Sequence, residues 1–212
     1  VTDPGSQLNL TTPSTANFVI NSGSTIAVKS GGTLHSDLYF LIGVIGSAGT
    51  VTVDGTGSSI TSSALANFGE NSLGTAGAGS LTLSTSATGS LPNGLQLGNA
   101  TGSAGTLAIL SGASLTTGPL DVGSIASAST GIVNLTGGTL TQSGSATLTL
   151  GAASLSTASL TIAPSGTFTT GTGKTTINPT GNLTLQSGGT ANFNGNLTNA
   201  GILSLAGTHT WA

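Results

Sequence analysis

Histidine and carboxylate side chains are the groups in this sequence that are suited to acid–base chemistry. The 212 residues include two His and five Asp or Glu. One stretch, His35-Ser36-Asp37, contains the residue types of a hydrolase triad. Because a triad is defined by the geometry of its three members, which adjacent residues cannot adopt, we expect no catalytic role for this stretch.

The carboxylates are scattered along the chain rather than clustered. Enzymes that cleave carbohydrates use clustered carboxylates for acid–base work, whereas each of the five acids here lies in a stretch of its own and arginine is absent. We interpret Asp54 as a turn-forming residue and Asp121 as an outward residue of a strand. Glu70 is expected at a corner of the fold. The sequence therefore predicts a protein that is not an enzyme, and it identifies no catalytic, cofactor-binding or metal-binding residue.

Two further features resemble known ligand sites only in part. His209 has no second ligand at metal spacing, so we expect a surface histidine. Residues 171–175 resemble a phosphate loop, but Phe168 stands where the first glycine of that motif belongs. No strand-to-helix pattern follows it, so we expect a corner turn and no cofactor.

Charge is almost absent from the composition. Only 3% of residues are charged, against roughly a quarter in ordinary soluble domains. So few positive charges argue against a nucleic-acid partner. The longest apolar run, residues 38–45, is too short to span a membrane. The absence of cysteine and methionine suits an extracellular location, and a first residue other than Met fits a processed chain or an excerpt of a longer one.

A short phrase recurs along the chain: a small residue, Gly or Ala, and then an apolar–polar–apolar triplet. Successive copies are 20 to 30 residues apart, most often about 26, which indicates one supersecondary unit repeated on a shared core. Frequent Gly and β-branched residues disfavour helix. The first apolar residues of the copies are Ile26, Val51, Leu81, Leu107, Val133, Leu160, Leu183 and Leu203.

Each repeat contains two further short apolar stretches, as residues 32–34 and 41–43 illustrate. We therefore predict an all-β protein, a parallel β-solenoid of about eight coils with three short strands to a coil and a repeat of ~26 residues. Residues 1–23 carry only part of the pattern and are interpreted as an irregular N-terminal coil. Residues 24–212 are expected to form one continuous solenoid domain.

Alternation along each phrase places its two apolar side chains on one face. We expect the interior to be lined by Val51/Val53, Leu81/Leu83, Leu107/Ile109, Val133/Leu135, Leu160/Ile162, Leu183/Leu185 and Leu203/Leu205. The outward column is expected to consist of Ala27, Thr52, Thr82, Ala108, Asn134, Thr161, Thr184 and Ser204.

The cycle Gly-Ser-Ala-Gly-Thr-Val-Thr-Val-x-Gly-x-Gly-Ser-Ser-Ile at 46–60 is followed by Leu-x-Leu-Gly-Asn at 95–99 and Leu-x-Val-Gly-Ser at 120–124. It resembles the β-strand repeat of bacterial autotransporter (type V secreted) passenger domains and of PEP-CTERM-associated surface proteins. The resemblance covers roughly residues 24–205 and is clearest from 46 to 151. It implies a secreted or surface-anchored right-handed β-helix that serves as an adhesin or a stalk.

Three hypotheses about function follow. The first is a non-catalytic extracellular structural protein, either a rod on the bacterial cell surface or a subunit of a fibre. Residues 199–212 contain no charged residue and no Pro that would hinder pairing with a further strand. Head-to-tail association through the terminal coils is therefore expected. The alternative is an adhesin that binds a host or matrix surface. A remote alternative is ice binding by the outward column, which Ala108 and Asn134 interrupt.

Overall fold

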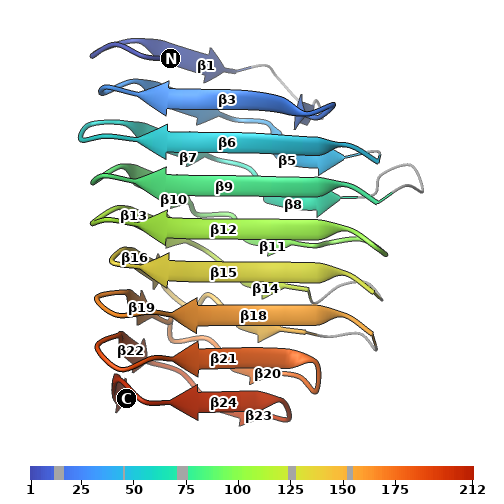
Figure 1. The fold of residues 1–212 in the computed structure, drawn as a ribbon, viewed down its shortest axis with the longest axis vertical. Helices are drawn as coiled ribbons and strands as arrows, with labels where there is room; N and C mark the ends of the chain where they lie inside the picture. The colour runs from blue at the N-terminus through green and yellow to red at the C-terminus, as the bar shows by residue number, and fades with distance from the viewer. Residues whose placement is uncertain (12–16, 45, 71–75, 124–127, 152–154) are drawn as a thin grey trace.

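The computed structural model describes residues 1–11, 17–44, 46–70, 76–123, 128–151 and 155–212. In these residues the chain winds through short strands into stacked coils, with the first coil at one end and the last at the other (Figure 1). Each complete coil contributes one strand to each of three sheets, which we name A, B and C. The predicted all-β solenoid with three strands to a coil is confirmed.

Sheet A has nine strands and sheets B and C have eight each. Sheet A consists of β1 (Gln7–Leu10), β4 (Thr33–Ser36), β7 (Ser59–Ser62), β10 (Thr88–Leu91), β13 (Ser114–Thr117), β16 (Thr139–Gln142), β19 (Thr167–Thr169), β22 (Thr190–Phe193) and β25 (Thr208–Trp211). Sheet B consists of β2 (Asn17–Ile20), β5 (Tyr39–Val44), β8 (Ala66–Glu70), β11 (Leu95–Leu97), β14 (Leu120–Val122), β17 (Leu148–Leu150), β20 (Thr175–Ile177) and β23 (Leu197–Asn199). Sheet C consists of β3 (Ser24–Lys29), β6 (Ala48–Asp54), β9 (Ala78–Ser84), β12 (Ala104–Leu110), β15 (Thr130–Thr136), β18 (Thr157–Ile162), β21 (Gly181–Leu185) and β24 (Ile202–Leu205).

Every pairing between these strands is parallel, and each strand pairs with the equivalent strand of the next coil. The apolar–polar–apolar phrases form sheet C. The further stretches illustrated by residues 32–34 lie in sheet A, and those illustrated by residues 41–43 lie in sheet B. β1 and β2 lie within residues 1–23 and pair with β4 and β5. That segment therefore adds one strand to each of sheets A and B.

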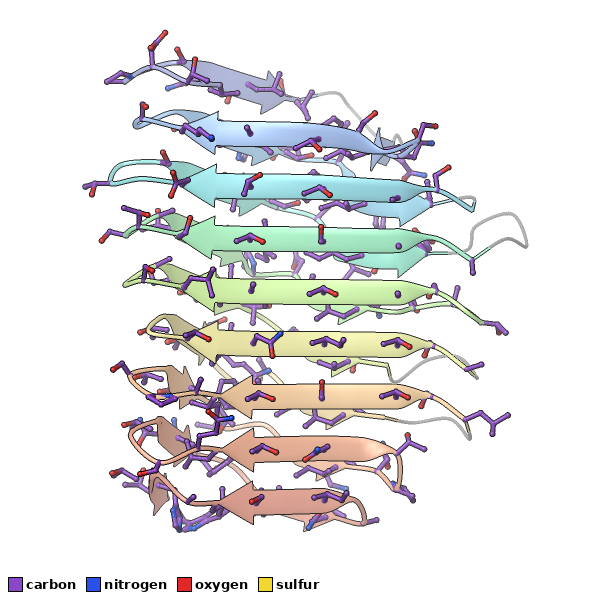
Figure 2. All side chains as sticks on the ribbon, viewed as in Figure 1. Atoms are coloured by element: carbon purple, nitrogen blue, oxygen red, sulfur yellow. The ribbon has the colours of Figure 1, made fainter. Side chains whose placement is uncertain are left out.

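The core runs through the inside of the whole stack. The predicted inward pairs of sheet C are fully buried from Val51/Val53 to Leu183/Leu185, and burial contributes about 1.5–3 kcal/mol for each such side chain. Leu203 and Leu205 are only partly buried, because β24 is the outermost strand of sheet C in the described ranges. Figure 2 shows that the side chains on the outer surface of sheet C are mostly short.

Glycine at the end of the sheet B strands allows neighbouring coils to approach at the corner. Gly69, for example, has a φ of +73°, which L side chains rarely adopt. A Cβ atom added there would lie 2.1 Å from the carbonyl oxygen of Ala104 in the next coil. Both the backbone conformation and the coil spacing therefore require glycine at this position.

Candidate functional site

The outer face of sheet A carries the side chains with the clearest chemical potential. Along β4 the burial alternates, so that Thr33 and His35 lie on the outer face while Leu34 and Ser36 are buried. Ser36 is only 1% exposed. Its hydroxyl donates to the Leu38 carbonyl oxygen at 3.2 Å. Ser36 is therefore shielded from solvent molecules, a position that the sequence analysis did not predict.

His35 instead connects a carboxylate to a hydroxyl group of the next coil. Its Nε2 atom lies 3.0 Å from Asp37 Oδ1, and its Nδ1 atom lies 2.7 Å from Thr61 Oγ1. Thr61 lies on β7 and is the register partner of His35. The His35 and Asp37 side chains are 33% and 42% exposed. The three residues form a continuous hydroxyl–imidazole–carboxylate chain, which we term the sheet A relay.

The ionisation state of Asp37 determines which ring nitrogen of His35 carries the hydrogen in the sheet A relay. A hydrogen bond from the Ser63 hydroxyl is the main cause that holds the pKa of Asp37 below its usual value. Burial opposes this lowering of the pKa, and the nearby His35 imidazole lowers the pKa further. An ionised carboxylate only accepts hydrogen bonds, so Nε2 of a neutral imidazole must carry the hydrogen. Nδ1 is then an acceptor, and the Thr61 hydroxyl donates to it.

This arrangement polarises the Thr61 oxygen in the manner of an activated nucleophile. The sequence pattern did not predict this arrangement, for two reasons. His35 and Asp37 form an i, i+2 pair, which lies on one side of an extended chain, whereas the triad hypothesis joined them to Ser36 on the other side. Thr61 lies 26 residues away, one repeat along the chain, and that repeat length was the signal that could have identified it.

The sheet A relay belongs to two outward columns of polar side chains, which we name the hydroxyl face of sheet A. The register aligns the outer residues of successive strands from β1 to β25. One column consists of Gln7, Thr33, Ser59, Thr88, Ser114, Thr139, Thr167, Thr190 and Thr208. The other consists of Asn9, His35, Thr61, Ser90, Thr116, Thr141, Thr169, Asn192 and Thr210.

The outward column predicted on sheet C is confirmed. Register pairs connect its eight members in order from Ala27 to Ser204. The alanines at 27 and 108 interrupt its hydroxyl groups, whereas the columns of sheet A contain a hydroxyl at both outer positions of every strand from β7 to β19. The more regular polar face is therefore the one on sheet A, which the sequence analysis did not identify.

Asp54 is the last residue of β6 and accepts a hydrogen bond from Ser84 Oγ at 2.7 Å. This bond, a second one from Thr85 and the charge of Lys29 hold the pKa of Asp54 below its usual value. Asp121 lies at the outward position of β14, as predicted. Neither residue joins another carboxylate or His in a group of three that could hold a metal ion, and no such group occurs in the described ranges.

Glu70 ends β8 directly after the corner glycine, as expected, but it is less exposed than a corner position suggests. Burial raises the pKa of Glu70, and a hydrogen bond from the Asn67 side chain opposes this effect. Asn67 is itself only 5% exposed. Its Oδ1 atom and Glu70 Oε2 are buried without a hydrogen-bond partner in the described part of the chain.

The remaining predicted positions lie in ordinary surface surroundings. His209 is exposed on β25, where its ring lies edge-on to Trp211 at 6.2 Å between centroids. Residues 171–174 form the turn that enters β20, and its backbone is tied to the previous coil by the Thr172 amide, which donates to the Gly144 carbonyl oxygen. This is the corner turn that the sequence predicts.

Comparisons with known proteins add little to this description. No family model matches the chain, and no curated protein matches it. One similar solved structure is the crystal structure of a TibC-catalysed, hyper-glycosylated TibA fragment spanning residues 55–350, which is 17% identical. That match covers 99% of this chain and 97% of the fragment, with a TM-score of 0.21. At so low a TM-score the likeness supports no conclusion about this protein.

Proposed function

We propose that the protein is an extracellular structural rod of a bacterial cell surface. The observation that carries this proposal is the continuity of three parallel sheets and one apolar core through all the coils (Figure 1). In such a stack each coil contacts only its neighbours, and the shape is extended by repetition. The resemblance of the repeats to those of autotransporter passenger domains supports the same role.

A fibre is the assembled form of this proposal. β23, β24 and β25 are the last strands of their sheets, and open strand edges present unpaired backbone groups that recruit further strands. Trp211 lies on the edge strand β25 and stacks on Phe193 with 4.4 Å between ring centroids. The Trp211 side chain remains 48% exposed. Head-to-tail stacking of a second copy would cover this apolar end.

An adhesin is the second candidate. The observation that favours it is the hydroxyl face of sheet A, where regular donors and acceptors could contact a polar surface along the side of the rod. Val19 and Tyr39, which are 39% and 48% exposed on sheet B, add an apolar contact near one end. In this case the contacts lie along the rod and not at its ends.

Electron microscopy of the purified chain at several concentrations tests these forms. Filaments with an axial repeat of about 4.8 Å would support the fibre, and isolated rods of fixed length would support a stalk or an adhesin. Compact or irregular particles would contradict the proposal as a whole.

Two variants of one strand provide the matched comparison. Leu203→Lys places a charge in the inner cross-section of the last coil and is expected to abolish filaments. Ser204→Lys adds the same charge on the outer face of β24 and is expected to preserve them. Equal loss of filaments in both variants would show that assembly does not proceed through this end.

A further inference from the structure

We propose that the sheet A relay is an acyl-transfer centre, in which Thr61 is the nucleophile, His35 is the general base and small activated esters are the acyl donors. This activity goes beyond the structural role and does not depend on it. It rests on the geometry of three side chains from two neighbouring coils and on the position of a fourth, Ser90.

The imidazole of His35 is held at both ends. Asp37 Oδ1 lies 3.0 Å from Nε2, and Thr61 Oγ1 lies 2.7 Å from Nδ1, so the ring cannot rotate without losing both contacts. Asp37 is positioned in turn by the Ser63 hydroxyl. The Asn93 side-chain amide donates to the Ser63 carbonyl oxygen, so that three successive coils fix the orientation of the base.

Thr61 differs from the other hydroxyls of its column because it alone is hydrogen-bonded to a histidine in the described part of the chain. The other histidine, His209, lies opposite the buried Ala191 and therefore not at an outward position of the face. Thr116 lies two strands further along the same column. It provides an internal control with the same residue type, sheet and facing direction.

Ser90 completes the arrangement on the side of Thr61 opposite His35. The register places Thr61 between His35 on β4 and Ser90 on β10, and adjacent strands lie about 4.8 Å apart. A carbonyl oxygen bound at Thr61 would lie within reach of the Ser90 hydroxyl. Ser90 is therefore the group positioned to donate a hydrogen bond to a developing oxyanion.

The reaction balances with an ester as the only co-reactant. Thr61 Oγ attacks the ester carbonyl carbon while its proton passes to His35 Nδ1, which gives a tetrahedral intermediate whose oxyanion faces Ser90. The bond from this carbon to the leaving oxygen then breaks, and the leaving group takes the proton from His35. The products are an acyl ester of Thr61 and a free alcohol, and the imidazole is neutral again. Water can attack the acyl group by the same route and restore Thr61.

The site is open to solvent because it lies on an exposed sheet face. The exposure of His35 and Asp37, 33% and 42%, admits a donor directly from solvent. A test therefore uses p-nitrophenyl acetate with the full chain, and it measures p-nitrophenolate release together with the acetylated positions by peptide mass spectrometry. We expect acetylation at Thr61 at least about a hundredfold faster than at Thr116, the lower end of what general-base catalysis supplies.

Variants separate the roles of the individual groups. Thr61→Val and His35→Gln are expected to abolish the fast phase, Thr61→Ser to retain it, and Ser90→Ala to slow it without changing the modified position. Thr116→Val is expected to leave the rate unchanged. A thermal unfolding curve for each variant controls for loss of the fold, and retention of the reaction in Thr61→Ser keeps the test informative if the valine variant unfolds.

Two results would overturn the proposal. The first is that acetylation is spread evenly over the hydroxyl face of sheet A, or that it is confined to the lysines and the amino terminus. The other is an acetylated His35 imidazole with an undiminished rate in Thr61→Val, because the histidine would then be the nucleophile. Neither result bears on the filaments or rods seen by microscopy, so the two proposals fail independently.

Discussion

Alternation of side chains along β4 decides which of its groups can react. Ser36 is buried against the Leu38 carbonyl, whereas His35 lies on the outer face and contacts Thr61. The outward position of His35 can be predicted from alternation alone. The partner of His35 cannot be predicted from alternation alone, because it depends on the number of residues in the coil. A coil shorter or longer by one residue would place Ile60 or Ser62 opposite His35 in place of Thr61. The sheet A relay therefore depends on exact coil length as well as on residue type.

Glu70 provides a prediction at the same scale. Burial raises the pKa of Glu70 in the folded chain, so the folded state binds its proton more tightly than the unfolded state does. Stability from this group is therefore present below the unfolded pKa and is lost as pH rises through the folded pKa. We expect Glu70→Gln to gain stability relative to the parent as pH rises from the unfolded pKa of a Glu, about 4.3, through the folded pKa, measured by urea unfolding.

Asp54 serves as the control, because its pKa shift is opposite in direction to that of Glu70. Its pKa is lowered by the Ser84 hydrogen bond above all, so its contribution is present above the unfolded pKa and is lost as pH falls through the folded pKa. Asp54→Asn should therefore lose stability at pH 7 and match the parent in strong acid. The same pH trend in both variants would show that these local environments do not govern the response.

The strands themselves were the most predictable part of the structure. Sheet C follows from period-two alternation, and its register follows from the repeat, so that Leu81 and Leu107 pair as expected. Sheet B shows where alternation fails. Leu41 and Asn67 occupy outward positions between buried neighbours, yet each is only 5% exposed. What covers an outward position depends on tertiary packing, which alternation within a single strand does not encode.

Corner glycines lead to a prediction at this scale. Gly69→Ala would place a methyl group 2.1 Å from the Ala104 carbonyl oxygen at a φ of +73°. Strain of about 1–3 kcal/mol from each cause should destabilise the fold by about 3 kcal/mol or more. Gly144 has a φ of +53° with open space around it, so Gly144→Ala should cost only about 1 kcal/mol. Urea unfolding measures both, and equal losses would mean that coil spacing does not constrain the corner.

The whole molecule behaves as a one-dimensional stack, so its stability should vary along its length. A strand in the middle, such as β12, has a paired strand and a filled core on both sides. β24 has a partner on one side only, and its apolar side chains are partly exposed.

Hydrogen exchange tests this gradient in dilute, unassembled protein. Amides of β12 should exchange at least about tenfold more slowly than those of β24, because end coils open without disturbing the remainder. Leu107→Ala in β12 serves as the comparison, since it should speed exchange in the surrounding coils but leave β24 nearly unchanged. Uniform protection from β3 to β24 would contradict the stack and indicate all-or-none opening.

The register between sheet C strands has a consequence for how such a gene can change. β6, β9 and β12 all begin with Ala-Gly, and the register pairs Ala48 with Ala78 and Ala78 with Ala104. Without the middle unit, the first residue of β6 would therefore meet the same residue type at the start of β12. An in-frame duplication or loss of one unit therefore creates no new kind of junction, and it changes the length of the molecule by a single step. Unequal recombination can in this way adjust the length of the protein in whole-number increments while the three-sheet architecture is kept.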